Sequence, residues 1–235
     1  MNVASMAVVV PARNEEALLP AALDALAAAS RHPLLAGLRV LTVVVADSCH
    51  DRTAAVARRA GALVVEGDYR NPGRARAAGT DRALAELGAP AGGIWIAATD
   101  ADSVVPPDWL AHQRARAHEG WAAVVGTVVL PPSAAAERHA RGYEAGRPPA
   151  GTPWRHPHVH GANLGVAAYA YRDAGGFPPL GAGEDRALVA ALEGRGHRVL
   201  RTADSPVLTS ARLRARARGG FGDHLAALAA GQGAG

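Results

Sequence analysis

The sequence contains no lysine, a single cysteine and few aromatic residues. All 25 of its basic residues are arginine, which indicates a coding bias and lowers the functional weight of any one arginine. The lone Cys49 excludes an internal disulfide and a cysteine-based zinc cluster, and it is compatible with a reducing cytoplasm. We expect Cys49 to be a small packed residue. An aromatic content of 4% does not favour a protein that stacks on nucleic-acid bases.

Long apolar runs and the common phosphate-binding loops are missing as well. No run approaches the length that spans a bilayer, and the chain enters a predicted strand without a basic leader. No G-x-G-x-x-G follows that strand, and no G-x-x-x-x-G-K-S/T occurs, so any nucleotide phosphates must be held by a metal ion and arginine. We expect a cytoplasmic protein, and peripheral contact with the inner face of a membrane is an open alternative.

The composition is otherwise that of an ordinary globular domain. The 235 residues are 49% hydrophobic and 20% charged, enough for one large domain with a full core. The net charge of +4 fits anionic small-molecule substrates or an acidic membrane surface. It does not require nucleic acid as a partner.

The stretch 94–103 is the one around which the rest of the chain is organised. An apolar run over 94–98 predicts a buried strand, and Asp100 and Asp102 follow it directly. Two carboxylates this close suit a hard divalent cation, which would bridge the phosphates of a substrate. An aspartate-rich turn that caps the next helix is the structural alternative, because D-x-D alone is a weak pattern.

Strands and helices alternate over the first hundred residues. Strands are predicted at 6–10, 40–46, 62–66 and 94–98, with helices between them at 17–30, 53–60 and 74–87. This alternation predicts an α/β fold with a parallel sheet, and Asn14 is predicted to cap the first helix. The first, second and fourth strands end in polar residues, at 11–15, Asp47 and Asp100. We expect these residues at one edge of the sheet, where open α/β sheets bind ligands.

The second half of the chain is less regular. The pattern predicts helices at 109–119, 133–143 and 183–192, a strand at 121–130, and short edge strands at 199–200 and 206–208. A loop rich in Pro, His and Arg at 147–159 holds Trp154 and is typical of a substrate lid. His156, His158 and His160 alternate and would share one face, where a polar loop is favoured over a metal or phosphate site. Residues 231–235 are predicted to form a flexible tail.

Seven segments stand in a defined order along the chain, at 8–16, 44–53, 73–79, 99–102, 160–163, 175–177 and 184–185. This series resembles glycosyltransferase family 2, with the nucleotide-sugar half first and the acceptor half second. The resemblance implies a GT-A-type Rossmann-like αβα sandwich with a mostly parallel central sheet. It also implies a single domain over 1–230, divided into a nucleotide-sugar-binding half (1–103) and a smaller acceptor-binding half (104–230).

The resemblance assigns donor-side roles to individual residues. Pro11, Ala12 and Arg13 would line the base and ribose pocket, and Glu15 would accept a hydrogen bond from the ribose. Asp47 would accept a base N–H, and Arg76 would lie near the base or the diphosphate. Asp100 would lie by the ribose and the metal, and Asp102 would bind Mg²⁺ or Mn²⁺ directly. The metal would neutralise charge on the departing diphosphate.

On the acceptor side, Glu184 and Asp185 match the acidic pair of the family. An attacking hydroxyl must lose its proton, and Asp185 is the predicted general base. The alternative for this pair is helix N-capping, since acidic side chains stabilise that end of a helix in any protein. His160, Gly161, Asn163 and Trp154 are the predicted acceptor-binding residues.

The resulting expectation is a metal-dependent transfer of one sugar from a nucleoside diphosphate sugar, UDP rather than GDP, to a hydroxyl of a small molecule, lipid-linked molecule or glycan, with inversion. One alternative is a retaining enzyme, such as those that make glucosyl-3-phosphoglycerate. A nucleotidyltransferase is disfavoured because its Gly- and Lys-rich N-terminal loop is missing. A third alternative uses Arg212, Arg214, Arg216 and Arg218, which could clamp a pyrophosphate or bind a membrane surface or nucleic acid.

Overall fold

The computed structural model describes residues 1–88, 93–149, 154–212 and 221–230. Within these residues, eight strands form one sheet in the order β3-β2-β1-β4-β7-β6-β8-β5. Their bounds are β1 Ser5–Ala12, β2 Arg39–Asp47, β3 Leu63–Gly67, β4 Ile94–Ala98, β5 Ser103–Val104, β6 Ala123–Val129, β7 Leu164–Ala167 and β8 Val199–Thr209. The predicted tail at 231–235 lies outside the described residues.

The first four strands of this order are parallel, as the alternation predicts. β1 pairs with β2 on one side and with β4 on the other, and β3 pairs with β2. Both faces of such a sheet are covered, which explains the uninterrupted valine run from Val8 to Val10 in β1. In the register Val9 lies beside Val43 and Ala98, so β1, β2 and β4 end at the same edge.

The other half of the sheet is mixed, because only β7 and β5 run opposite to β1–β4, and it corrects the predicted edge strands. β7 is antiparallel to both β4 and β6, whereas β8 runs parallel to β6. The two predicted edge strands are one strand, β8, because its pairing with β6 continues across a register shift between Gly126 and Val128. The edge is formed by the two-residue strand β5, which pairs antiparallel with β8.

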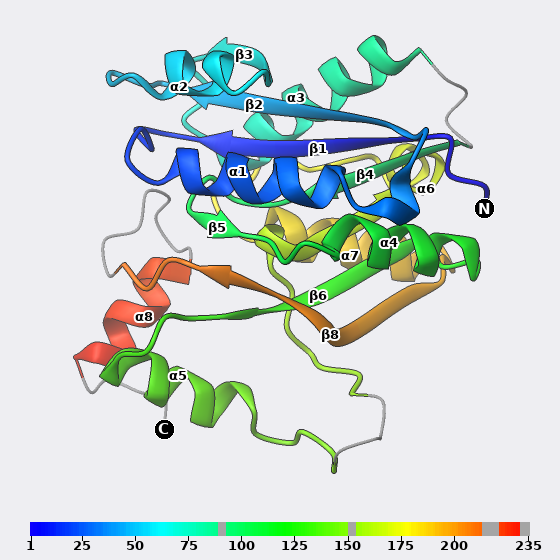
Figure 1. Ribbon diagram of the computed structural model, residues 1–235. Helices are drawn as coiled ribbons and strands as arrows, with labels where there is room; N and C mark the ends of the chain where they lie inside the picture. Colours follow the sequence, from blue (N-terminus) through cyan, green and yellow to red (C-terminus); the bar gives the residue numbers. More distant parts are fainter. Residues whose placement is uncertain (89–92, 150–153, 213–220, 231–235) are drawn as a thin grey trace.

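Helices cover both faces of the sheet. Figure 1 shows α1 and α4 in front of it and α3, α6 and α7 behind it, which gives the expected three layers. α5 and α8 pack against one another to one side of the sheet. The bounds are α1 Leu19–Ser30, α2 Thr53–Arg59, α3 Pro72–Leu87, α4 Trp109–His118, α5 Ala134–Tyr143, α6 Ala168–Asp173, α7 Glu184–Gly194 and α8 Phe221–Ala229.

The segment before α1 differs from the prediction. Asn14 does not cap this helix, which begins at Leu19 with no side-chain cap. Asn14 instead adopts a positive φ of 53°, and its Oδ1 accepts the backbone N–H of His50 at 2.8 Å. Its own N–H points to Sγ of Cys49 at 3.4 Å, and this partly buried cysteine is packed as expected. Asn14 therefore joins the loop after β1 to the loop after β2.

The core lies between the sheet and its helices and contains two buried tryptophans. Every residue of β4 is buried, and Trp95 of this strand donates from Nε1 to Gln113 of α4 at 2.7 Å. Trp109 is fully buried at the start of α4. Burial of each such side chain stabilises the fold by about 2–3 kcal/mol. In the described part of the chain, no helix combines the length and hydrophobicity that crossing a membrane requires.

Candidate active site

A large cleft lies at the C-terminal ends of β1, β2 and β4. Its volume is about 1330 Å³, above the roughly 300–1,000 Å³ of most small-ligand pockets. Its walls include all the predicted donor-side residues: Pro11, Ala12, Arg13, Glu15, Asp47, Arg76, Asp100 and Asp102. From the predicted acceptor side they include His160, Gly161, Glu184 and Asp185. The fold thus brings both halves of the sequence together around one cavity.

Asp47, at the end of β2, holds the loop that leads into α3. Its carboxylate accepts hydrogen bonds from the backbone N–H groups of Tyr69 (2.7 Å), Arg70 (2.8 Å) and Asn71 (3.3 Å), and from the hydroxyl of Ser48 (2.9 Å). Oδ2 accepts only the longest of these bonds, so this oxygen keeps capacity for a ligand. Ser48 and Arg70 have positive φ angles of 52° and 49° at this rim.

Arg76 of α3 is the centre of a buried cluster with Asp100 and Glu184, here named the Arg76 cluster. Its guanidinium forms ion pairs with Asp100, just after β4, and with Glu184, the first residue of α7. Side chains of Arg76 and Glu184 are each 6% exposed. Burial raises the pKa of Glu184, although the charge of Arg76 opposes this shift. The sequence predicted Arg76 near the base or diphosphate, and the structure shows that two carboxylates already hold its guanidinium.

Gly161 is required beside this cluster. A Cβ atom at this position would lie 2.5 Å from Nη2 of Arg76. Its backbone N–H also donates to Oδ2 of Asp185 at 2.7 Å. Gly161 therefore acts through its small size and its backbone.

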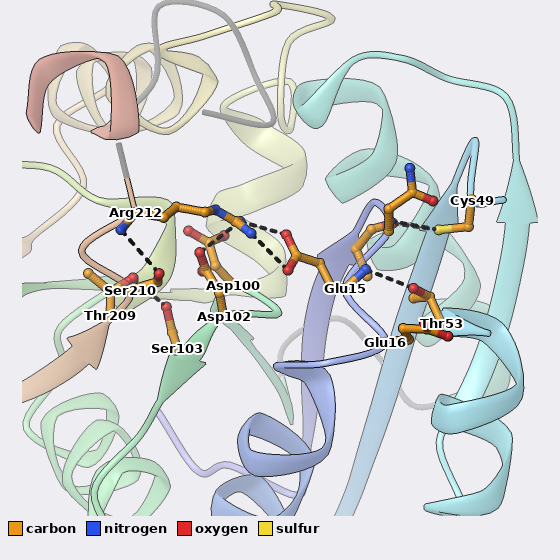
Figure 2. Close-up of polar contacts among 12 residues, drawn as sticks. Glu15, Glu16, Cys49, Thr53, Asp100, Asp102, Ser103, Thr209, Ser210 and Arg212 are labelled. Atoms are coloured by element: carbon orange, nitrogen blue, oxygen red, sulfur yellow. Dashed lines mark hydrogen bonds and ion pairs between the residues drawn. The ribbon is translucent and has the colours of Figure 1, made fainter. Parts of the chain in front are cut away.

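A second cluster, the Arg212 cluster, joins Arg212 to Glu15 and Asp102. The guanidinium donates to both oxygens of Glu15, at 3.0 and 2.5 Å, and lies 2.8 Å from Oδ2 of Asp102. Figure 2 shows it between the two carboxylates, with Asp100 next to Asp102. Burial and the charge of Asp100 raise the pKa of Asp102 to about 6, against the opposing effect of Arg212. Glu15, the predicted ribose acceptor, is thus engaged by an arginine.

The two clusters leave the floor of the cleft negatively charged. Together they contain four carboxylates and two guanidinium groups, which gives a net charge of −2 when all six groups are ionised. Carboxylate oxygens are the donors that Mg²⁺ and Mn²⁺ prefer, so this donor set fits a divalent cation. Among the described residues, no group of three or more His, Cys, Asp or Glu side chains could hold a metal by itself. A metal here would complete its coordination with oxygen atoms of water or substrate.

Asp185 lies in the cleft wall, in the first turn of α7. Its Oδ2 accepts the N–H of Gly161 and its Oδ1 accepts the N–H of Arg186, both at 2.7 Å. The helix begins directly after Gly183, which has a φ of 78°. Asp185 therefore stabilises the N-terminus of α7, and its partly exposed carboxylate also faces the cavity.

Asn163 is not among the residues that line the cleft, and its predicted role in acceptor binding stays a prediction. Its Nδ2 donates to the carbonyls of Thr127 in β6 and Ser205 in β8, both at 2.9 Å. Its Oδ1 accepts from Nε1 of Trp109 at 2.8 Å. Both amide hydrogens are used inside the protein, so Asn163 is a buried link between β6, β8 and α4.

Trp154 is likewise not among the residues that line the cleft, and its contact with the acceptor stays a prediction. Its ring packs edge-on against the rings of His156 and His158, with centroids 5.5 and 5.9 Å apart. The guanidinium of Arg147 lies 5.3 Å from the tryptophan ring centroid. Trp154 therefore anchors its loop. The lid prediction over 147–159 falls partly on residues outside the described ranges.

The three alternating histidines share one face, as predicted. The rings of His156 and His158 stack at 5.9 Å, and those of His158 and His160 at 6.4 Å. His156 is fully buried, and its Nε2 lies 3.1 Å from the carbonyl oxygen of Thr202. Burial lowers the pKa of His160 to about 3, with smaller effects from neighbouring histidines. His160 is therefore neutral where it lines the cleft.

Sequence reasoning missed the wall formed by α5 and α8. Arg138 and His139 of α5 and Phe221 of α8 line the cleft, and the ring of Phe221 lies 5.1 Å from His139 and 5.3 Å from His160. No motif marks these positions. Arg212 was noted only as one of four alternating arginines, and the other three lie outside the described residues.

Several solved structures with the same fold are complexes with a nucleotide or a nucleotide sugar. TarS of S. aureus in complex with UDP-GlcNAc gives a TM-score of 0.63 and 16% identity, over 89% of this chain and 58% of that one. A mannosyltransferase from Pyrobaculum calidifontis in complex with GDP-Man and Mn²⁺ gives 0.62 and 25%, over 90% and 58%. GalNAc-T7 with UDP, GalNAc and Mn²⁺ gives 0.65 and 15%, over 89% and 44%.

These likenesses confirm the predicted GT-A-type α/β fold. The chain spans 44–58% of the length of these three solved chains. None of the curated proteins compared matches it. The family model described as glycosyl transferase family 2 matches residues 7–170, which is more than half of the chain. The order of motifs, the fold and this match agree, and the chain belongs to glycosyltransferase family 2.

Proposed function

We propose that the protein transfers one sugar from a nucleoside diphosphate sugar to a hydroxyl acceptor, with inversion at the anomeric carbon. The observation that carries this proposal is one cleft that combines an acidic floor, at the C-terminal ends of β1, β2 and β4, with Asp185 in its wall. The volume of about 1330 Å³ has room for a donor and an acceptor together.

On the donor side, Pro11, Ala12 and Arg13 are proposed to line the base and ribose pocket. Asp47 would accept a base N–H at Oδ2, the oxygen that the loop leaves least occupied. The relatives are described with UDP, UDP-GlcNAc or GDP-Man. We propose UDP-sugar before GDP-sugar for this chain.

Asp102 is the proposed ligand of a divalent metal ion, with Asp100 beside it. Two of the compared structures contain Mn²⁺, and Mg²⁺ has the same preference for oxygen ligands. A bound metal would supply Lewis-acid stabilisation of the departing diphosphate. Arg76 is assigned a positioning role, because its ion pairs hold both Asp100 and Glu184.

Asp185 is the proposed general base, because its carboxylate is oriented by two backbone N–H groups and faces the cavity. A carboxylate held in this way can accept the proton that the acceptor hydroxyl loses as the glycosidic bond forms. Glu184 is proposed to act through Arg76 and to have no contact with the acceptor. His160 and Gly161 form the adjacent acceptor wall.

The proposal predicts metal-dependent turnover that needs both aspartates. Release of nucleoside diphosphate is measured with UDP- and GDP-sugars, a panel of hydroxyl acceptors and Mn²⁺. Asp102→Ala and Asp185→Asn are each expected to lower turnover at least about a hundredfold. The exposed Asp173→Asn, whose carboxylate pairs with His197 on the surface, serves as the control.

Full activity in both cleft variants would reject the assignment. The anomeric configuration of the product, read by NMR, separates inversion from the retaining alternative. A retained configuration would show that Asp185 orients substrate and is not the base.

A further inference from the structure

Arg212 lies where a bound cation is expected. Its guanidinium engages both oxygens of Glu15 and also contacts Oδ2 of Asp102, the proposed metal ligand. The side chains of Glu15 and Asp102 are 5% and 13% exposed, whereas that of Arg212 is 28% exposed. The arginine is therefore the most exposed of the three side chains, and Figure 2 shows its guanidinium between the two carboxylates.

The pairing of β5 with β8 places Arg212 next to Asp102. Thr209, the last residue of β8, accepts a hydrogen bond from the hydroxyl of Ser103 in β5 at 2.8 Å. Ser210 then accepts the backbone N–H of Arg212 at 3.3 Å. Ser103 directly follows Asp102 in the chain, so this pairing brings the two charged side chains together.

A guanidinium and a divalent cation at the same carboxylate repel one another. The positive charge of Arg212 persists at any physiological pH, so the repulsion is relieved when the side chain leaves Asp102 for an anion farther from the metal. A diphosphate is such an anion, because guanidinium groups bind phosphate oxygens in a bidentate manner. Displacement of Arg212 from Asp102 would leave that carboxylate free at the moment the nucleotide arrives.

We infer that Arg212 is a donor-site residue that competes with the divalent metal for Asp102 and transfers to the diphosphate when the nucleotide binds. Metal and nucleotide binding are thereby coupled: each binds more tightly in the presence of the other. The inference rests on the proposed function, in which Asp102 holds the metal.

The experiment measures binding of Mn²⁺ to the full chain by electron paramagnetic resonance, with and without UDP. Removal of the competing charge in Arg212→Gln is expected to tighten Mn²⁺ binding without UDP by roughly tenfold, because two positive charges a few ångströms apart repel strongly. The same variant loses most of the improvement that UDP produces in the wild type. Arg212→Lys, which keeps the charge, stays near the wild-type Mn²⁺ affinity.

Arg82→Gln is the matched control, since Arg82 pairs with Glu86 on the exposed face of α3. Unchanged or weaker Mn²⁺ binding in Arg212→Gln would overturn the inference, and so would equal UDP coupling in the variant and the wild type. Thermal unfolding of each variant shows that the comparison is made on folded protein. These outcomes need no sugar transfer, so failure of the proposed function appears separately, as a wild type that binds Mn²⁺ and UDP but turns over no nucleotide sugar.

Discussion

At the scale of single residues, the sequence predicts which side chains line the cleft, but it does not predict which of them form ion pairs with one another. Asp47, Asp100 and Asp102 come together as predicted, because the ends of parallel strands in register meet at one edge. Their partners were not predictable in the same way. The contacts of Arg76 with Glu184 and of Arg212 with Glu15 join residues more than a hundred positions apart, and no local pattern encodes such pairs.

Gly161→Ala is predicted to damage the cleft from a position with no functional side chain. The added Cβ would lie 2.5 Å from Nη2 of Arg76, so the guanidinium that pairs with Asp100 and Glu184 must shift. Overpacking of this kind costs about 1–3 kcal/mol of the free energy of unfolding, which urea denaturation measures. Turnover of nucleotide sugar is expected to fall with it. Gly194→Ala, in α7 with open space around its Cβ, should be neutral or slightly stabilising. Equal stability of both variants would contradict the packing argument.

At the scale of helices and strands, the parallel half was predictable and the other half was not. Short apolar runs rich in Val, Ile and Ala, separated by helical segments, identify β1 to β4, with bounds correct to within about two residues. β8 was divided into two because its middle residues, 203–205, are small or polar, and they lie in the register shift between the two stretches that pair with β6. β5 and α6 are too short to produce a periodic signal, and α8 follows an arginine-rich stretch that hides its start.

Asn163→Ala tests whether this residue joins elements or binds substrate. The substitution leaves the indole N–H of Trp109 and the carbonyls of Thr127 and Ser205 without their partner, at a cost of about 2–4 kcal/mol in unfolding free energy. Ser133→Ala, which removes the exposed N-cap of α5, should cost about 1 kcal/mol. Chemical denaturation compares the two. Affinity for UDP, measured well below the melting temperature, should change little in Asn163→Ala. A large loss of UDP affinity without loss of stability would contradict the structural role.

At the scale of the whole molecule, the balance of charge below neutral pH depends on the carboxylates and the histidines. The basic side chains are all arginine and stay charged, so they set a constant background. Burial of His160 in its neutral form makes the folded protein less stable, relative to the unfolded chain, as the pH falls. Because burial depresses the pKa of His160 in the folded state, protons bind preferentially to the unfolded chain in mildly acidic solution.

Stability is therefore predicted to fall as pH decreases below the ordinary histidine pKa, and to keep falling until pH approaches the folded value of about 3. Between pH 7 and pH 5, His160 alone should account for about 2 kcal/mol of lost unfolding free energy. Denaturation at a series of pH values measures this slope. His160→Gln should reduce it, while the exposed His118→Gln should leave it unchanged. An identical slope in wild type and His160→Gln would show that His160 is protonated in the folded protein.

The hydrogen bond between Ser103 and Thr209 fixes the positions of two oppositely charged residues near it in the chain, Asp102 and Arg212. Asp102 precedes one partner by a single residue and Arg212 follows the other by three, so the ladder of β5 and β8 sets how far apart they stand. A slip of one residue in that ladder would turn Ser103 and Thr209 to opposite faces and draw the carboxylate and the guanidinium apart. The short edge strand β5 thus sets the distance between Asp102 and Arg212.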